Sequence, residues 1–273
     1  MDWQTPAGQS AQDLLRSLLD QPRLGLVTDV DGTISPIVAD PDAAQVTPRA
    51  RALLDALRSH LALVAVISGR AVADVRERIG VPGLIVAGNH GLETWADGAV
   101  RLAPEAAAYR PALEAARDAL HAALPPGMQI EDKGATLSVH YRRAPDPAAA
   151  EATFGPVAQA VADAHGLRLF HGRMVFELRP PLDIDKGTAF RRLVRDYALD
   201  GAVYLGDDTT DADALRAARD LRAAGTCYAL ALGVESDDTP ESVRAASDML
   251  LPGVAGVEDF LAWLLSALSA SST

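Results

Sequence analysis

Short, nearly continuous apolar runs recur in the first and last thirds of the chain, separated by longer segments with an apolar residue every three or four positions. The short runs are typical of strands buried on both faces of a parallel sheet, and the longer segments are typical of amphipathic helices. This alternation predicts the α/β class, with a doubly wound, Rossmann-like parallel sheet whose ligands bind at the carboxyl ends of the strands. The predicted strands span 24–28, 61–67, 84–87, 202–205 and 227–232, and the predicted helices span 48–60, 71–79, 188–197 and 211–224.

The middle of the chain has a different order of elements. A helical pattern opens at Pro104 and ends at Pro125-Pro126-Gly127. The pattern then predicts two strands, a helix and two more strands, at 128–132, 136–142, 147–165, 167–171 and 174–179. This order predicts a smaller α+β cap domain at 104–181, inserted into a core domain that comprises 1–103 and 182–273.

The charge balance limits the partners of the chain. A net charge of -12 disfavours extended contact with nucleic acid or with an anionic membrane, so phosphate can bind only through a local cluster. Of the 25 basic residues, two are lysines, Lys133 and Lys186. In so arginine-rich a chain, a retained lysine indicates a site that needs a compact ammonium group, although chance retention is the alternative.

Cellular location is suggested by the single cysteine, Cys227, which excludes an internal disulfide framework and suits a reducing cytoplasm. Because Cys227 lies in a short apolar strand, packing is favoured over a catalytic thiol. The first residues, Met1-Asp2-Trp3, lack the basic and apolar stretches of a secretory signal. No apolar run approaches the ~20 residues of a membrane span. We therefore expect a cytoplasmic monomer or weak oligomer.

Acidic residues follow the first predicted strand in Asp29-Val30-Asp31-Gly32-Thr33. Strand alternation directs Asp29 and Asp31 to the same side of the carboxyl edge of the sheet, where two carboxylates indicate a hard cation. A calcium loop is the alternative interpretation. It would need further oxygen ligands ending in a glutamate about twelve positions on, and Thr33-Ile34-Ser35-Pro36 supplies none.

Two further segments suit a phosphate group. Ser68-Gly69-Arg70 offers a hydroxyl and backbone amides before a helix, although a plain turn and helix cap would have the same pattern. Lys186 opens the helix that follows the inserted domain and offers a positive charge, although a lone lysine is ordinarily solvated.

The segment Gly206-Asp207-Asp208-Thr209-Thr210-Asp211 concentrates three carboxylates after another strand. Their mutual repulsion favours a cation. Mg²⁺ prefers a few carboxylates with additional water or phosphate oxygens, which one aspartate from each of two loops would supply. Helix N-capping by Asp208 or Asp211 is the alternative role for those two residues.

Together and in this order, these elements resemble the haloacid dehalogenase-like phosphatases, over residues 23–265. The resemblance implies that Asp29 is a nucleophile that forms an aspartyl-phosphate and that Asp31 is the general acid and base. The phosphate-binding residues that it implies are Thr33, Ser68, Gly69 and Lys186. The Mg²⁺ ligands that it implies are Asp29, the backbone carbonyl of Asp31, and Asp207, with Asp208 and Asp211 in support.

The inserted domain carries a polar sheet face. On 136–142, Leu137, Val139 and Tyr141 share one side, and Ser138, His140 and Arg142 share the other. A sheet with one polar face is suited to binding sugar hydroxyls, with an ordinary solvated face as the alternative.

Several segments are similar to the cap motifs of trehalose-6-phosphate phosphatases, namely Glu131-Asp132-Lys133-Gly134, His140-Tyr141-Arg142 and 172–180. In the core, Gly88-Asn89-His90-Gly91-Leu92-Glu93 is similar to a motif of the same family. Arg173 departs from the pattern, because the family usually has lysine there. The substrate-binding residues that the resemblance implies are His90, Glu131, Lys133, Arg142, Arg173, Glu177 and Arg179.

The resemblance therefore predicts Mg²⁺-dependent hydrolysis of trehalose 6-phosphate. A phosphatase for sucrose 6-phosphate or mannosyl-phosphoglycerate is the main alternative, since only the cap separates these substrates. A catalytically silent phosphosugar-binding domain is a further alternative, but it would be expected to have lost Asp29, Asp31 or the acidic cluster.

Overall fold

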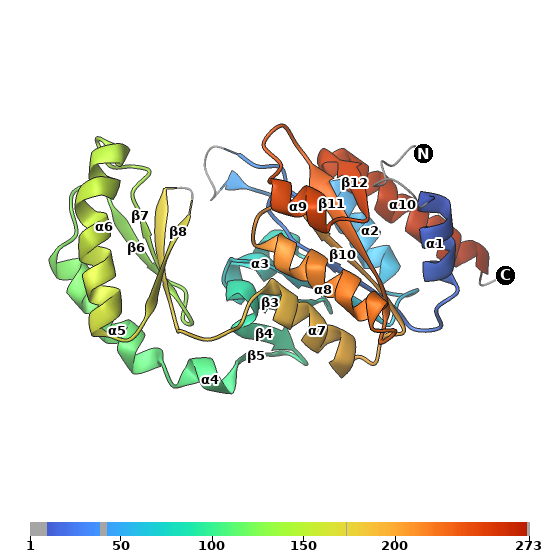
Figure 1. The fold of residues 1–273 in the computed structure, drawn as a ribbon, viewed down its shortest axis with the longest axis horizontal. Coiled ribbons are helices and arrows are strands. Elements are labelled where there is room, and N and C mark those ends of the chain that lie inside the picture. The colour runs from blue at the N-terminus through green and yellow to red at the C-terminus, as the bar shows by residue number, and fades with distance from the viewer. Residues whose placement is uncertain (1–9, 39–42, 173, 272–273) are drawn as a thin grey trace. The chain divides into compact units, whose positions relative to one another are not determined.

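The computed structural model describes residues 10–38, 43–172 and 174–271 of the 273-residue chain. It divides into a core unit, formed by 1–100 and 184–273, and a cap unit, formed by 101–183 (Figure 1). Each unit has its own sheet and its own hydrophobic cluster. The predicted fold class, a doubly wound α/β core with an inserted α+β unit, is confirmed.

The core sheet has eight strands in the order β12-β11-β10-β1-β2-β3-β4-β5. The six strands from β12 to β3 are parallel, and β4 pairs antiparallel with β3. The central strands consist almost entirely of buried aliphatic residues, as a sheet covered on both faces requires. The strands are β1 (Leu24–Thr28), β2 (Leu63–Ile67), β3 (Ile85–Gly88), β4 (Glu93–Ala96), β5 (Ala99–Leu102), β10 (Gly201–Gly206), β11 (Tyr228–Glu235) and β12 (Met249–Pro252).

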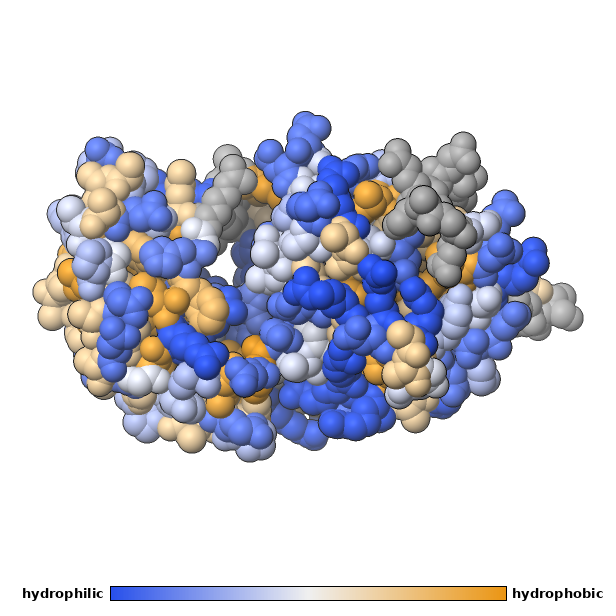
Figure 2. Space-filling model, viewed as in Figure 1, coloured by the Kyte–Doolittle hydropathy of each residue, from blue (hydrophilic) through white to orange (hydrophobic). Residues whose placement is uncertain are grey.

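Helices cover both faces of this sheet (Figure 1). One hydrophobic cluster joins the sheet to α1 (Ala11–Leu19), α2 (Pro48–Leu57), α3 (Val72–Ile79) and α10 (Gly253–Ser271). A second cluster joins the other face to α7 (Lys186–Asp196), α8 (Asp211–Ala223) and α9 (Glu241–Ala246). The outer surface of α7 and α8 is largely hydrophilic (Figure 2), and an ion pair between Arg191 and Asp220 links the two helices there.

An edge hairpin extends the sheet beyond the strands that the apolar pattern predicts. Strand β3 leads into a short 3-10 helix, η2 (Asn89–Gly91), and then into β4 and β5. Asp97 and Gly98 connect β4 and β5 with φ angles of 52° and 79°. Two successive positive φ angles are the mark of a type I′ hairpin turn, for which Asp-Gly is a preferred sequence.

Helix α10 corrects one expectation. Its residues Gly253–Ala270 have a mean hydropathy of 1.3 over 18 residues, which is long and apolar enough for a membrane span. No such run was expected from the sequence. One side of the helix nevertheless packs in the core, through Val257, Phe260, Leu261 and Leu264. In all, 28% of this window is buried inside the structure.

The cap unit places two helices on one side of a four-stranded antiparallel sheet, in the order β6-β7-β9-β8. The helical pattern that opens at Pro104 forms two helices rather than one. The second helix begins at Arg110, and Pro111 lies in its first turn, where proline is tolerated. Leu137, Val139 and Tyr141 are all buried, which confirms the predicted core face. The elements are α4 (Pro104–Ala107), α5 (Arg110–Ala122), β6 (Gln129–Asp132), β7 (Leu137–His140), α6 (Pro147–Ala164), β8 (Arg168–Gly172) and β9 (Val175–Arg179).

Candidate active site

The ends of β1 and β10 bring three acidic side chains together. The two strands are parallel neighbours, and Thr28 is paired with Leu205 near their carboxyl ends. Asp29 and Asp207 therefore leave the sheet side by side. One carboxylate oxygen from each of Asp29, Asp207 and Asp211 lies within 4.8 Å of the other two. These are three of the predicted site residues.

Lys186 lies directly against this cluster. It is the first residue of α7, which Asp185 and Thr188 begin with a reciprocal capping box. Its ammonium group donates to Asp29 Oδ1 at 2.8 Å and to Asp211 Oδ1 at 2.7 Å. The Lys186 side chain is only 3% exposed. A buried lysine in this position is an ion-pair partner and not the solvated residue of the alternative interpretation.

Asp211 accepts hydrogen bonds from four donors. Besides Lys186, the Tyr204 hydroxyl donates to Oδ1 at 2.6 Å. The backbone N–H groups of Asp207 and Asp208 donate to Oδ2 at 3.3 and 3.0 Å. Because these amides precede α8, Asp211 closes the loop before the helix instead of capping the helix. Asp208 itself is exposed, and its side chain accepts from the backbone of Thr209 at 2.7 Å.

Asp207 is held from the opposite side by the turn that follows Asp29. The Thr33 hydroxyl donates to Asp207 Oδ1 at 3.0 Å. Gly32 has a φ angle of 83°, and a Cβ atom there would lie 2.0 Å from Asp207 Oδ2. Only glycine allows this approach. The structure thus places Thr33, predicted to bind phosphate, in contact with a predicted metal ligand.

Burial changes the pKa values of the charged groups in this cluster. Burial and the charge of Asp211 raise the pKa of Asp29 well above its ordinary value, and Lys186 opposes that shift. The same two causes raise the pKa of Asp207 to about 7. Burial by itself lowers the pKa of Lys186, but the adjacent carboxylates of Asp211 and Asp29 reverse the effect and raise it. When all three carboxylates are ionised, their negative charge exceeds the positive charge of the Lys186 ammonium group.

This arrangement fits a small divalent cation. Carboxylate oxygens are the ligands that Mg²⁺ prefers, and a few of them from separate loops match its usual sites. Asp211 already accepts four hydrogen bonds. Asp29 and Asp207 are therefore better placed than Asp211 to bind the ion.

Asp31 is turned toward a different partner. Arg70 holds its carboxylate with two hydrogen bonds, from Nε at 2.6 Å and from Nη2 at 2.9 Å. Arg70 also donates to Asp74 at 2.9 Å, and Asp74 in turn accepts from Arg78. This fork is the geometry for which arginine is better suited than lysine. The partner of Asp31 is thus an arginine from the turn after β2.

The turn after β2 also contains the predicted phosphate binders Ser68 and Gly69. Ser68 is 1% exposed, and its hydroxyl accepts from the Arg70 backbone at 3.2 Å. The ring of His90 lies against Gly69, since a Cβ atom there would be 2.8 Å from two ring atoms. His90, predicted to contact substrate, therefore borders this turn.

In the cap unit, predicted substrate-binding residues gather on the polar face of the sheet. Glu177 is paired with Ser138 across β9 and β7, and Ser138 is paired with Glu131 across β7 and β6. Lys133 lies 3.5 Å from Glu177, and Arg179 forms an ion pair with the same carboxylate. Arg142 is half-buried beyond the end of β7. Arg173 lies outside the described residues.

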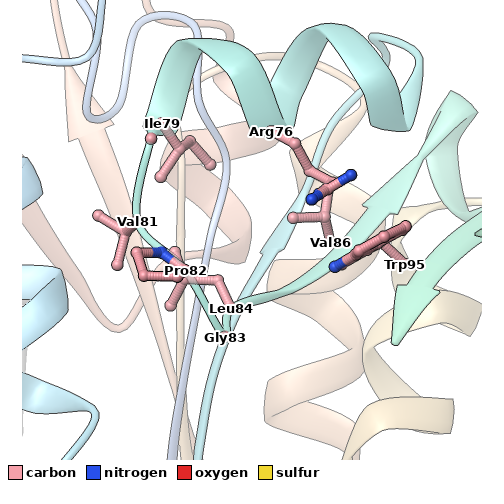
Figure 3. Close-up of a pocket in the computed structure, with 9 residues that line it drawn as sticks. Arg76, Ile79, Val81, Pro82, Gly83, Leu84, Val86 and Trp95 are labelled. Carbon is pink, nitrogen blue, oxygen red and sulfur yellow. The ribbon is translucent and has the colours of Figure 1, made fainter. Parts of the chain in front are cut away.

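A separate cavity of about 240 Å³ lies away from the acidic cluster, between the end of α3 and β4 (Figure 3). The guanidinium of Arg76 stacks over the Trp95 ring, 3.4 Å from its centroid, at one side of it. The cavity is lined by Arg76, Ile79, Gly80, Val81, Pro82, Gly83, Leu84, Val86 and Trp95. None of the predicted site residues is among them, so this cavity is not the candidate active site.

Sequence reasoning assigned no role to Arg70 or Tyr204. Arg70 follows the Ser-Gly pair directly, so its position beside a turn predicted to bind phosphate was the available signal. Tyr204 lies in an apolar strand, where it reads as a core residue. Its contact with Asp211 arises only because the loop after β10 folds back over the strand end.

Comparison with known proteins agrees with this geometry. The sequence model of the trehalose-phosphatase family matches residues 27–247. A trehalose-phosphate phosphatase of Mycobacterium marinum is 42% identical over 208 residues, which cover 73% of this chain and 52% of that protein. The counterpart from Mycobacterium tuberculosis is 43% identical over 197 residues, covering 68% and 49%. The chain thus spans about half the length of these curated relatives.

Solved structures of trehalose-6-phosphate phosphatases are also similar to this chain. The C-terminal domain of C. albicans trehalose-6-phosphate phosphatase is 25% identical with a TM-score of 0.76, over 96% of this chain and 99% of that one. Aspergillus fumigatus trehalose-6-phosphate phosphatase is 25% identical with a TM-score of 0.65, over 97% and 100%. The fold, the acidic cluster at the strand ends and these similarities lead to one conclusion: the chain belongs to the trehalose-phosphatase family.

Proposed function

We propose that the chain hydrolyses trehalose 6-phosphate to trehalose and phosphate, through a covalent aspartyl-phosphate on Asp29. The observation that carries the proposal is the contact between Asp29 and Lys186 inside a buried acidic cluster. Charged groups are rarely buried together in this number without a function, since their desolvation is costly. The substrate is inferred from the names of the matched relatives.

In the first step, an oxygen of Asp29 attacks phosphorus, and the bond from phosphorus to the sugar oxygen breaks. Asp31 gives a proton to that leaving oxygen. In the second step, a water molecule attacks the phosphorus of the aspartyl-phosphate and gives a proton to Asp31. Phosphate is released, and the Asp29 carboxylate is regenerated.

Lys186 and Ser68 neutralise and orient the phosphate oxygens in this proposal, together with the backbone of Gly69. An anionic nucleophile can approach a phosphate only when the repulsion between them is screened. Lys186 is suited to this task because it remains charged beside Asp29 and Asp211. In the free site it neutralises the nucleophile itself.

Asp29, Asp207 and the backbone carbonyl of Asp31 would hold Mg²⁺, with Asp208 and Asp211 in support. The ion supplies positive charge that stabilises the developing charge on the phosphate oxygens. Thr33 and Lys186 then keep the two carboxylates in place for the ion through their hydrogen bonds.

We propose that the polar face of the cap sheet recognises the sugar. Glu177 combines 8% exposure with ion-pair contacts to Lys133 and Arg179, so its orientation is fixed. A fixed carboxylate beside cationic donors is suited to sugar hydroxyls, which both donate and accept. Glu131, Arg142, Arg173 and His90 complete the proposed set of substrate contacts.

The single cysteine, whose thiol is buried, supports a reducing cytoplasmic location.

A phosphate-release assay over a panel of sugar phosphates, with and without Mg²⁺, tests the proposal. Trehalose 6-phosphate should be the best substrate, and Asp29→Asn should lose at least about a thousandfold in kcat, as loss of a nucleophile does. Asp248→Asn is the matched control, because Asp248 is another buried carboxylate that accepts a backbone N–H, from Ala231. Faster phosphate release from sucrose 6-phosphate than from trehalose 6-phosphate would overturn the proposed substrate but not the proposed covalent mechanism. Full activity of Asp29→Asn would overturn the covalent route.

A further inference from the structure

A turn between β3 and β4 has an unusual backbone. It comprises Gly88 to Glu93, and we call it the 88–93 turn. Asn89 and His90 have φ angles of 48° and 59°, in the left-handed region. Two consecutive non-glycine residues in that region are uncommon, and such strain concentrates at functional sites. The surrounding contacts must hold this conformation.

Those contacts are with the turn that contains Ser68. The backbone N–H of Asn89 donates to the Arg70 carbonyl at 2.8 Å, and the N–H of His90 donates to the Ser68 carbonyl at 2.9 Å. The His90 ring lies against Gly69 between these two bonds. The left-handed pair thus clamps all three residues of the segment 68–70.

Glu93 links the clamp to the adjacent helix. It is 7% exposed, and its Oε1 accepts from the Val72 backbone at 2.6 Å and from Asn89 Nδ2 at 3.0 Å. Val72 is the first residue of α3, and the N-cap residue Ala71 makes no side-chain cap. Glu93, the first residue of β4, therefore caps the N-terminus of α3 in place of Ala71. Gly88 leaves room for it, since a Cβ atom there would lie 2.8 Å from Oε1.

The opposite side of the 88–93 turn is attached to α7. Arg192 donates to the Gly91 carbonyl at 3.0 Å and to the Thr94 hydroxyl at 3.2 Å. A Cβ atom on Gly91 would lie 2.7 Å from that of Ala189. Helix α7 begins with Lys186. The same turn therefore contacts both elements that present the proposed phosphate-binding side chains.

We infer that Glu93 is a positioning residue, which holds the 88–93 turn so that Ser68, Gly69 and Lys186 converge on one phosphate group. The inference rests on the proposed function, because it concerns the phosphate site of that reaction. Glu93 touches neither the phosphate nor the acidic cluster. It acts through the Val72 amide and the Asn89 side chain, and needs only an acceptor oxygen for both.

Binding of orthovanadate in the presence of Mg²⁺, measured by calorimetry, tests this inference without turnover. Glu93→Ala should weaken binding by about tenfold or more, because a small misplacement of binding groups is costly. Glu93→Gln keeps an acceptor oxygen and should stay within about threefold of wild type. Asp248→Ala is the matched control: it also removes a buried carboxylate from a backbone N–H, so it should lower the thermal midpoint without changing vanadate affinity.

Asn89→Gly is the second variant, in case Glu93→Ala does not fold. Glycine readily adopts the left-handed conformation, and the variant removes the side-chain amide that donates to Glu93, so it should weaken vanadate binding measurably. Wild-type affinity in folded Glu93→Ala, or in Asn89→Gly if Glu93→Ala does not fold, would overturn the inference. So would a Glu93→Gln as weak as Glu93→Ala. If wild type binds vanadate but releases phosphate from no sugar phosphate, the proposed function fails while the positioning role is still decided by binding.

Discussion

Replacement of Lys186 by methionine removes an ammonium group that contacts both Asp29 and Asp211. The side chains have similar size, so the variant leaves little cavity. It does leave two buried carboxylates without their cationic partner. Breaking a buried ion pair from one side costs about 3–5 kcal/mol. Two hydrogen bonds to charged groups, at about 1.5–3 kcal/mol each, give a similar range of about 3–6 kcal/mol.

The loss should depend on pH, and its sign follows from the raised carboxyl pKa values. A carboxyl whose folded pKa lies above its unfolded pKa favours folding while it is protonated. That contribution is present below about pH 4, where the unfolded carboxyl is also protonated, and is lost as pH rises through the folded pKa. For Asp207 the folded pKa is about 7. Lys186 lowers the pKa values of Asp29 and Asp207. Without Lys186 these pKa values should rise further, so the stability of Lys186→Met should fall more than that of wild type as pH rises.

Thermal and denaturant unfolding in EDTA, at pH 5 and at pH 8, measure this effect. The deficit of Lys186→Met should be small at pH 5 and about 3–5 kcal/mol at pH 8, or roughly 6–20 °C for a domain of this size. Mg²⁺ should restore part of it at pH 8. Arg191→Met is the control on the same helix, since its exposed ion pair with Asp220 is worth at most about 1 kcal/mol. Equal stability of Lys186→Met and wild type at pH 8 would refute the electrostatic argument.

Three further predictions concern single side chains. Arg70→Met should lower kcat by about 10- to 100-fold, because the Asp31 carboxylate loses its two hydrogen bonds from the guanidinium group. Arg70→Lys should recover little of the lost activity, since lysine cannot make both bonds in the same plane. Unchanged steady-state kinetics would count against this role. Thr33→Val should raise the Mg²⁺ concentration for half-maximal activity about tenfold, since Asp207 loses a supporting hydrogen bond, and a metal titration would show it. Burial raises the pKa of the Cys227 thiol to about 12, so iodoacetamide should label it at pH 8 only after unfolding; rapid labelling of the native protein would disprove the assignment.

The sequence predicted the core sheet because its central strands are continuous apolar runs, and several of them end in acidic turns or in a turn predicted to bind phosphate. Asp29 and Asp207 follow such strands directly, so their meeting at one edge follows from the parallel arrangement. The ion pair between Lys186 and Asp29 joins residues 157 positions apart. It depends on where the inserted unit returns the chain to the core, which no local pattern encodes.

The edge hairpin was missed for a different reason. Strands β4 and β5 have four residues each, and β5 is largely exposed, so they lack an apolar run. Asp97-Gly98 was a usable turn signal. Glu93 was recognised only as the last residue of a segment similar to a family motif, and no role was assigned to it. Its burial and its role as a cap for α3 become visible only once β4 is paired with β3.

The central claim is that phosphate passes through Asp29, and peptide mapping of the acid-quenched enzyme tests it most directly. Wild-type protein is mixed with trehalose 6-phosphate and Mg²⁺, quenched during turnover, digested and analysed by mass spectrometry. We expect one added phosphoryl group on the peptide that contains Asp29, absent from Asp29→Asn and absent without substrate. Steady turnover with no phosphoryl group on that peptide, or with the group on another residue, would contradict it.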